Sequence, residues 1–145
     1  MRIDGEWYVG DDGIARPVIR GKIRATHGSW VRAPFLIDTG ADLTVLNAAV
    51  LRLLGLPLAQ SADRIGGVGG MATSVCVETT IRLVRDGATG VVFRGQFAAL
   101  TELEALDTCV LGRDITGLFS VIVDQPASTV CLLRERHRYS IESDA

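Results

Sequence analysis

Cysteine and histidine are scarce in this sequence. Its 145 residues contain three cysteines, Cys76, Cys109 and Cys131, and two histidines. No CxxC pair occurs, and neither histidine has a cysteine or histidine neighbour at the spacing of metal ligands. The sequence therefore predicts no disulfide framework and no zinc site, and we expect neither a metal nor a cofactor. The free thiols are predicted to be small buried hydrophobic groups.

Long apolar runs, excess basic charge and aromatic side chains are also lacking. No apolar run reaches the ~18 residues of a membrane-spanning helix, and the start, Met1 to Glu6, lacks the basic-then-apolar order of a signal peptide. The net charge is −2 and aromatic residues make up 6% of the chain. These values provide neither a basic groove nor stacking platforms for nucleic acid. We expect a cytoplasmic protein with no membrane and no nucleic-acid partner.

Hydrophobic residues and glycine, in contrast, are plentiful. Hydrophobic residues make up 48% of the chain and glycine occurs sixteen times, which is typical of a folded globular protein and not of a disordered one. The length allows one domain, so we expect residues 1–145 to form a single domain. The charged or glycine-bearing ends, residues 1–12 and 134–145, are predicted to be frayed.

Short alternating segments bounded by turn residues predict strands over most of the chain. The segment from Thr73 to Leu83 alternates apolar and polar residues, which indicates a half-buried strand. Two hairpins are predicted, one around the turn Thr26 to Ser29 and one around the turn Asp124 to Ser128. The other expected strands are residues 16–25, 30–37, 91–100, 119–123 and 129–133.

Helices are predicted to be few and short. Asn47 can cap a helix from Ala48 to Leu54, and Gly55 is placed to end it. A second turn of helix is expected over Arg113 to Thr116, after Gly112. The fold class that follows from the residues is one compact, mostly β domain.

The segment Phe35-Leu36-Ile37-Asp38-Thr39-Gly40-Ala41-Asp42 carries the strongest chemical signal. An apolar strand runs into an acidic residue, a hydroxyl and a glycine, so we expect Asp38 at a sharp turn deep in apolar surroundings, which favour a protonated carboxyl. Gly40 permits a close backbone approach, and Thr39 can hold the turn through its hydroxyl. The arrangement suits a catalytic acid, although Asp-Thr-Gly alone also describes an ordinary tight β-turn.

Two further segments add weight to this motif. Ile65-Gly66-Gly67-Val68-Gly69-Gly70 is a glycine-loaded hairpin tip with Val68 at its centre, which can open as a cover. Alone it also fits a flexible surface loop, whereas a phosphate-binding loop is disfavoured because no Lys or Ser/Thr follows at P-loop spacing. The third segment, Val110-Leu111-Gly112-Arg113-Asp114, taken alone describes a solvated turn.

In this order, the three segments resemble the retropepsin-like family of aspartic proteases over roughly Arg16 to Ile115. The resemblance implies an all-β fold, a closed barrel-like retropepsin subunit with a glycine-rich flap hairpin and one or two short helices. It also implies an aspartic endopeptidase that hydrolyses peptide bonds with a water activated by two Asp38 carboxyls, one from each subunit.

The resemblance implies roles for individual residues as well. It assigns the catalytic loop to Asp38, Thr39 and Gly40, with Thr39 interlocking the loops of two subunits. The substrate-binding positions that it implies are Leu36, Ala41, Asp42, Gly66, Gly67, Val68 and Val110, of which Val68 is the flap tip. Arg113 and Asp114 are implied to support the site, Arg113 through a partly buried ion pair with Asp42.

A homodimer is required by this chemistry. Only one Asp-Thr-Gly occurs in the chain, and Asp107-Thr108-Cys109 lacks the glycine. We therefore expect two partners, a second copy of the chain and a peptide or protein substrate with apolar side chains beside the scissile bond. The chain departs from the viral pattern in residues 1–12 and in an extra hairpin, 118–133, which is expected to carry much of the interface or to cover an open sheet edge.

Two other functions fit parts of the sequence. A retropepsin-fold dimerisation or peptide-binding module with little or no turnover is the alternative. The intact Asp38-Thr39-Gly40 and glycine flap favour the protease, because a binding module does not need the acid. A β-barrel that binds nucleic acid is disfavoured by the composition described above.

Overall fold

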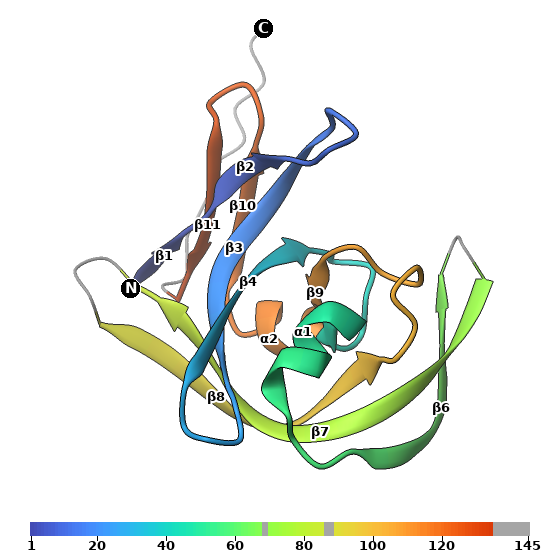
Figure 1. Cartoon of the computed structure of the whole chain (residues 1–145). Helices are drawn as coiled ribbons and strands as arrows, with labels where there is room; N and C mark the ends of the chain where they lie inside the picture. Colours follow the sequence, from blue (N-terminus) through green and yellow to red (C-terminus); the bar gives the residue numbers. More distant parts are fainter. Residues whose placement is uncertain (68–69, 86–88, 135–145) are drawn as a thin grey trace, which may run out of the picture.

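We describe a computed structural model of the chain for residues 1–67, 70–85 and 89–134 (Figure 1). The strands are β1 (Arg2–Asp4), β2 (Glu6–Val9), β3 (Ala15–Arg24), β4 (Trp30–Ile37), β5 (Val45–Leu46), β6 (Ala59–Gly67), β7 (Gly70–Val84), β8 (Gly90–Leu100), β9 (Cys109–Leu111), β10 (Ser120–Asp124) and β11 (Thr129–Leu133), and the helices are α1 (Ala48–Leu54) and α2 (Arg113–Thr116). The mostly β fold, both expected hairpins and both short helices are confirmed.

The larger sheet closes on itself. Its strand order is β2-β3-β4-β9-β5-β8-β7-β6. Because β3 also pairs with β7, the strands β3, β4, β9, β5, β8 and β7 form a closed ring. The end strands β2 and β6 lie outside the ring as the outer arms of hairpins with β3 and β7. The chain therefore has the barrel-like arrangement that the family resemblance implied.

Alternating apolar side chains fill the ring. In β7, Val77, Ile81 and Leu83 are at most 1% exposed, whereas Glu78 on the other face is exposed. Phe35, from strand β4, is fully buried in the same cluster. Each such side chain contributes about 1.5–3 kcal/mol when it leaves water, so this core fixes the strands on which the site is built.

The N-terminal residues were predicted to be frayed, but residues 2–4 and 6–9 form strands. β1 pairs antiparallel with β11, which also pairs with β10, and together they form a second, three-stranded sheet. Ile3 is fully buried because the C-terminal hairpin offers β1 both an edge to pair with and an apolar face to cover. β2, which follows, pairs with β3. Of the C-terminal segment predicted to fray, residues 134–145, Arg134 donates its backbone N–H to the Met1 carbonyl at 3.1 Å, and residues 135–145 lie outside the described residues.

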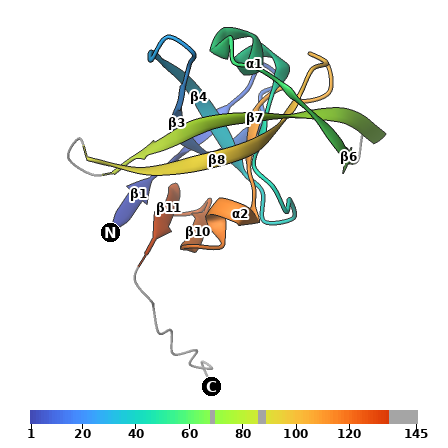
Figure 2. The same ribbon diagram turned by 90° about the horizontal axis from the view of Figure 1, so that it is seen from below.

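Helix α1 begins and ends as its capping residues predict. The Asn47 side chain accepts a hydrogen bond from the Val50 N–H at 3.0 Å, and Gly55 ends α1 with a left-handed φ of 60°. α2 follows Gly112, and Figure 2 shows the two helices apart from each other, with α1 near β4 and α2 near β10. The helices thus cover different parts of the barrel and do not pack as a layer.

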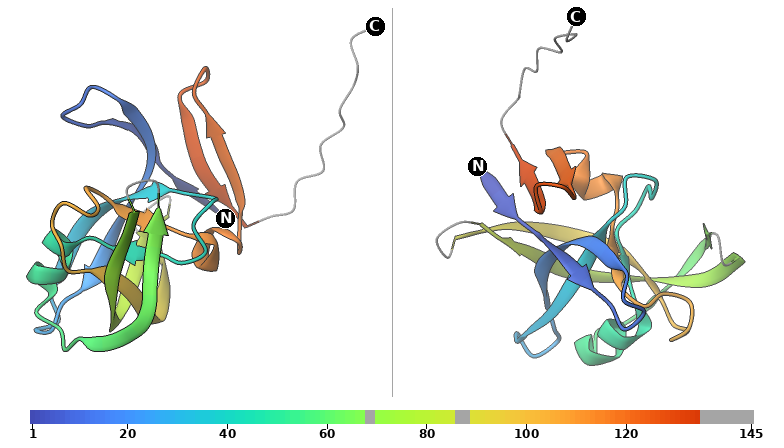
Figure 3. Two further views of the ribbon diagram at one scale, coloured as in Figure 1. Left: turned by 90° about the vertical axis from the view of Figure 1, so that its right-hand side faces the viewer. Right: turned by 90° about the horizontal axis from the view of Figure 1, so that it is seen from above.

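Two hairpins extend beyond the barrel on the same side, β2–β3 and β10–β11 (Figure 3). The Trp7 Nε1–H donates to the Asp124 carbonyl at 3.4 Å and joins them. The β6–β7 hairpin extends from another part of the barrel (Figures 1 and 2). The chain therefore has a closed core with projecting hairpins at separate places.

Candidate active site

Asp38 lies directly after β4, where the apolar strand enters a tight turn. Its backbone N–H donates to the Leu111 carbonyl at 3.2 Å, and its carbonyl accepts from the Ala41 N–H at 3.3 Å. Its carboxylate Oδ1 accepts from the Gly40 N–H at 2.9 Å. The backbone of the turn thereby orients the carboxyl.

This turn is more accessible than the sequence predicted. Ile37 is 8% exposed, but Asp38 is only half-buried, and Thr39 and Gly40 are exposed. The expectation that Asp38 lies deep among apolar side chains is wrong for the single chain, because the turn carries these residues beyond the end of the buried strand. The carboxyl is therefore on an open face of the chain.

Thr44, which is fully buried, anchors the far end of the loop. Its hydroxyl accepts from the Gly112 N–H at 3.1 Å and donates to Asp114 Oδ1 at 2.7 Å. Its backbone N–H donates to Asp114 Oδ2 at 3.0 Å. The Asp114 carboxylate also accepts from the Ile115 N–H at 2.9 Å, so it joins the loop to the start of α2.

Backbone contacts complete the junction between residues 38–44 and 112–115. The Arg113 N–H donates to the Ala41 carbonyl at 2.8 Å, and the Asp114 N–H donates to the Asp42 carbonyl at 3.1 Å. Gly112 is required because a Cβ there would collide with the Leu43 carbonyl. The two segments therefore form one hydrogen-bonded unit beneath Asp38.

Arg113 and Asp42 form an ion pair between Nη2 and Oδ1. Their side chains are 60% and 77% exposed. The pair was expected to be partly buried and is instead exposed in the single chain, where such pairs contribute about 0–1 kcal/mol. The part-buried contact between Thr44 and Asp114 is the stronger support of the loop.

A cavity of about 420 Å³ opens beside Asp38. Its lining brings together Asp38 and three of the implied binding residues, Ala41, Gly66 and Val110. The rest of the lining is Val45, Ile65, Gly70, Met71, Ala72, Leu100, Glu102, Glu104, Ala105 and Leu106. An apolar wall with a few carboxylates suits an apolar side chain held beside a reactive acid.

The remaining implied binding residues lie elsewhere. Leu36 lines a neighbouring hollow together with Tyr8. Asp42 is engaged by Arg113, and Gly67 pairs with Gly70 in the β6–β7 hairpin. Val68, the implied flap tip, lies outside the described residues.

Sequence reasoning missed Thr44 and part of the cavity wall. Thr44 did carry a signal, because a hydroxyl residue directly before the apolar pair Val45-Leu46 is expected to be buried and to need a partner. Glu102 and Glu104 carried none, since charged residues between two strands describe a solvated loop. Only the fold places them in the wall that Asp38 shares.

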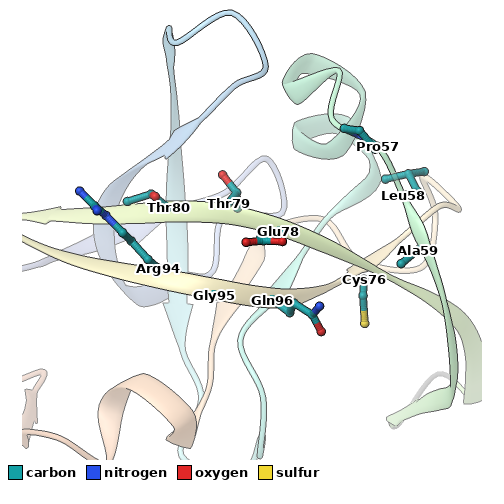
Figure 4. Close-up of a pocket in the computed structure, with 10 residues that line it drawn as sticks. All are labelled: Pro57, Leu58, Ala59, Cys76, Glu78, Thr79, Thr80, Arg94, Gly95 and Gln96. Atoms are coloured by element: carbon teal, nitrogen blue, oxygen red, sulfur yellow. The ribbon is translucent and has the colours of Figure 1, made fainter.

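A larger hollow of about 610 Å³ is lined by residues of β7 and β8 and by residues 57–59 (Figure 4). Its side chains do not converge on one point, because Thr79 is directed away from Cys76 and Gln96. The Thr79 hydroxyl is already used, donating to the Arg24 carbonyl at 2.7 Å. This hollow therefore lacks the convergent polar groups of a reactive site.

The buried thiols are inert. Burial raises the pKa of the Cys109 thiol to about 11 and also raises the pKa of Cys131, which keeps both protonated at neutral pH. Cys76 was expected to be buried but is half-exposed. In residues 1–67, 70–85 and 89–134, no group of three or more His, Cys, Asp or Glu could hold a metal ion. No helix in those ranges is long and apolar enough to cross a membrane.

The chain belongs to the aspartyl protease family, whose model matches residues 23–115. This match spans the Asp38 loop, the glycine hairpin and the Gly112 turn, the segments on which the sequence-based resemblance depends. Together with the solved structures below, it makes the chain a retropepsin-like member of that family. No curated protein matches.

Two solved structures show the same fold. EIAV protease, in a complex with the inhibitor HBY-793, is 28% identical, with a TM-score of 0.54 over 70% of this chain and 86% of its own. A retropepsin-like aspartic protease from Rickettsia conorii is 18% identical, with a TM-score of 0.52 over 91% of this chain and 88% of its own. The predicted retropepsin fold is confirmed.

Removing the Asp114 carboxylate is predicted to cost more stability than removing the Arg113 guanidinium. Asp114→Ala leaves the buried Thr44 N–H and the Thr44 hydroxyl proton without an acceptor and should lower the free energy of unfolding by about 2–3 kcal/mol. Arg113→Ala removes an exposed ion pair and should cost less than about 1 kcal/mol. Urea denaturation at one protein concentration measures both. A larger loss for Arg113→Ala would contradict this order.

Adding a methyl group at Gly112 is predicted to separate the Asp38 loop from α2. Gly112→Ala should lower the free energy of unfolding by about 2 kcal/mol or more, because the methyl group meets rigid backbone. Gly95→Ala is the matched control, since a Cβ at Gly95 in β8 has no atom within 4 Å and should be neutral or stabilising. Equal effects of the two substitutions on urea denaturation would show that the Leu43 backbone moves to accept the methyl group at little cost, and would contradict the prediction.

Proposed function

We propose that this protein is a homodimeric aspartic endopeptidase in which each subunit supplies one Asp38. The observation that carries the proposal is the placement of Asp38 in the lining of a largely apolar cavity. Its carboxylate accepts from the Gly40 N–H, and its backbone N–H donates to the Leu111 carbonyl. Membership of the aspartyl protease family supports it.

The chemistry uses two carboxyls that share one proton. The ionised Asp38 takes a proton from a water whose oxygen bonds to the scissile carbonyl carbon, while the protonated Asp38 gives its proton to the carbonyl oxygen. The protonated Asp38 then gives its proton to the amide nitrogen while the ionised Asp38 takes one from a hydroxyl of the resulting diol, and the carbon–nitrogen bond breaks. Like charges held so close cannot both ionise, which maintains the shared proton.

The second carboxyl is assigned to another copy of the chain. The sequence has a single Asp-Thr-Gly, and Asp107, in the similar triplet, lines the neighbouring hollow and not the Asp38 cavity. The exposure of Thr39 and Gly40 supports this assignment, because the face that carries them can meet the same face of a copy across a twofold axis.

Strand β10 offers the edge at which that copy would dock. Among the described strands it pairs only with β11, so its second edge is open. Val123 is 44% exposed and Ile122 is half-buried. An open apolar edge is a template for another strand. β10 also follows α2 closely, and α2 is bonded to the Asp38 loop. Pairing of β10 with the β10 strand of a second copy would therefore bring the Asp38 loops of the two copies together.

The opposite edge of the same sheet is less suited to this role. β1 has three residues, and two of them, Arg2 and Asp4, are exposed and form an ion pair at 2.6 Å. A short, charged edge strand resists pairing with another chain. We therefore assign the interface to β10, with the two three-stranded sheets joined into one.

The β6–β7 hairpin is assigned as the cover of the cleft. Ile65, Gly66, Gly70 and Met71 from this hairpin line the cavity that holds Asp38. An extended peptide between hairpin and loop would meet backbone groups of Gly40 and Gly66 as a strand meets its neighbours. The apolar wall then receives side chains beside the scissile bond.

Replacing the acid is predicted to abolish hydrolysis. Asp38→Asn removes both carboxyls of the dimer, so cleavage of an unfolded protein substrate should fall by several orders of magnitude while the fold is retained. The measurement is gel electrophoresis of the substrate after incubation across acidic and neutral pH. Wild-type protein that binds the substrate without cleaving it would favour the alternative, a peptide-binding module. Asp38→Asn protein within about tenfold of wild type would place the chemistry elsewhere.

A charge at the centre of β10 is predicted to dissociate the dimer. In Ile122→Lys two ammonium groups would face each other across the axis, which should weaken dimerisation about tenfold or more. The control is Ile14→Lys, which makes the same substitution at a 55% exposed site in the β2–β3 turn. Analytical ultracentrifugation and activity over a dilution series measure the effect. An Ile122→Lys protein that stays dimeric and active on dilution would exclude β10 as the interface.

A further inference from the structure

The charged groups that line the Asp38 cavity are all acidic. Within the described residues the lining contains Asp38, Glu102 and Glu104, and no lysine, arginine or histidine. The two glutamates come from the segment 101–108 between β8 and β9, which lies between α1 and the β6–β7 hairpin (Figure 1). They therefore stand in the wall of the cleft itself.

These two glutamates differ from other exposed carboxylates of the protein. Asp12 pairs with Arg16 at 2.6 Å, which lowers the pKa of Asp12 to about 2, and Asp42 pairs with Arg113. Neither Glu102 nor Glu104 forms an ion pair with a described residue. The carboxylates of Glu102 and Glu104 can therefore form an ion pair with a ligand in the cleft.

The wall beside them is apolar. Val45, Leu100 and Leu106 lie in the same lining, and the long side chains of arginine and lysine combine an apolar stem with a charged end. Such a side chain can place its stem on this wall and its charge against the glutamates. A neutral apolar side chain could use only the wall.

We propose that this cleft selects peptides carrying an arginine or lysine close to the scissile bond, with the basic group held by Glu102 and Glu104. The proposal rests on the proposed function, because it requires the Asp38 cavity to be the place where a peptide lies. It adds a charge preference to the apolar preference that the wall predicts.

Peptide binding to full-length Asp38→Asn protein tests the preference without cleavage. The probes are fluorescein-labelled eight-residue peptides with two central leucines and, at one flanking position at a time, either arginine or its neutral isostere citrulline. Fluorescence anisotropy should show about three- to tenfold tighter binding of the arginine peptide at the best position, as expected for one or two exposed ion pairs. The difference should shrink in about 0.5 M salt.

Substitutions in the 101–108 segment identify the carboxylates responsible. Glu102→Gln combined with Glu104→Gln should bring the arginine-to-citrulline ratio close to one. Asp107→Asn is the matched control, since it removes one charge from the same segment but lines the neighbouring hollow, and it should keep the ratio.

The outcomes separate this proposal from the proposed function. Equal binding of the two peptides at every position, or a preference that survives the double substitution, would overturn the selection by Glu102 and Glu104. Failure of the wild-type protein to cleave any peptide would contradict the endopeptidase, and the binding ratio would still decide the charge preference.

Discussion

The contact between the Asp38 loop and the turn before α2 is the interaction on which the site depends. Thr44 is buried with its amide and hydroxyl both bonded to the Asp114 carboxylate, and Gly112 lets the two backbones approach closely. The position of the loop is set by this junction and by the parallel pairing of β4 with β9. A carboxyl mounted in this way can stand on an open face without losing its orientation.

The edges of the two sheets bear on the proposed dimer. The closed ring of strands satisfies its own edges, whereas β10 ends the second sheet with an apolar edge that no other described strand pairs with. The intramolecular pairing of β1 with β11 uses the N-terminal strand within one chain. The proposed dimer therefore relies on β10 and on the exposed Asp38 loops, and β1 closes the outer side of the sheet.

Local chemistry made much of the fold predictable. Period-two alternation marked β7, and Asn47 and Gly55 marked the ends of α1, because these signals depend only on neighbouring residues. Predictions that depended on distant parts of the chain were less accurate. Residues 2–9 form strands because β11 and β3 offer edges to them, and the pair Arg113–Asp42 is exposed because no described residue covers it. Glu102 and Glu104 entered the cleft only through the path of the 101–108 segment.

The central claim, that each active site takes one Asp38 from each of two chains, is tested most directly by mixing subunits. Wild-type and Asp38→Asn proteins are combined in equal amounts, allowed to exchange subunits, and assayed at a fixed total concentration above the dimer dissociation constant. If both carboxyls are needed, only dimers with two wild-type chains are active, and activity should fall to about one quarter of the wild-type value. A fall to about one half would show that each chain acts alone and would contradict the shared site.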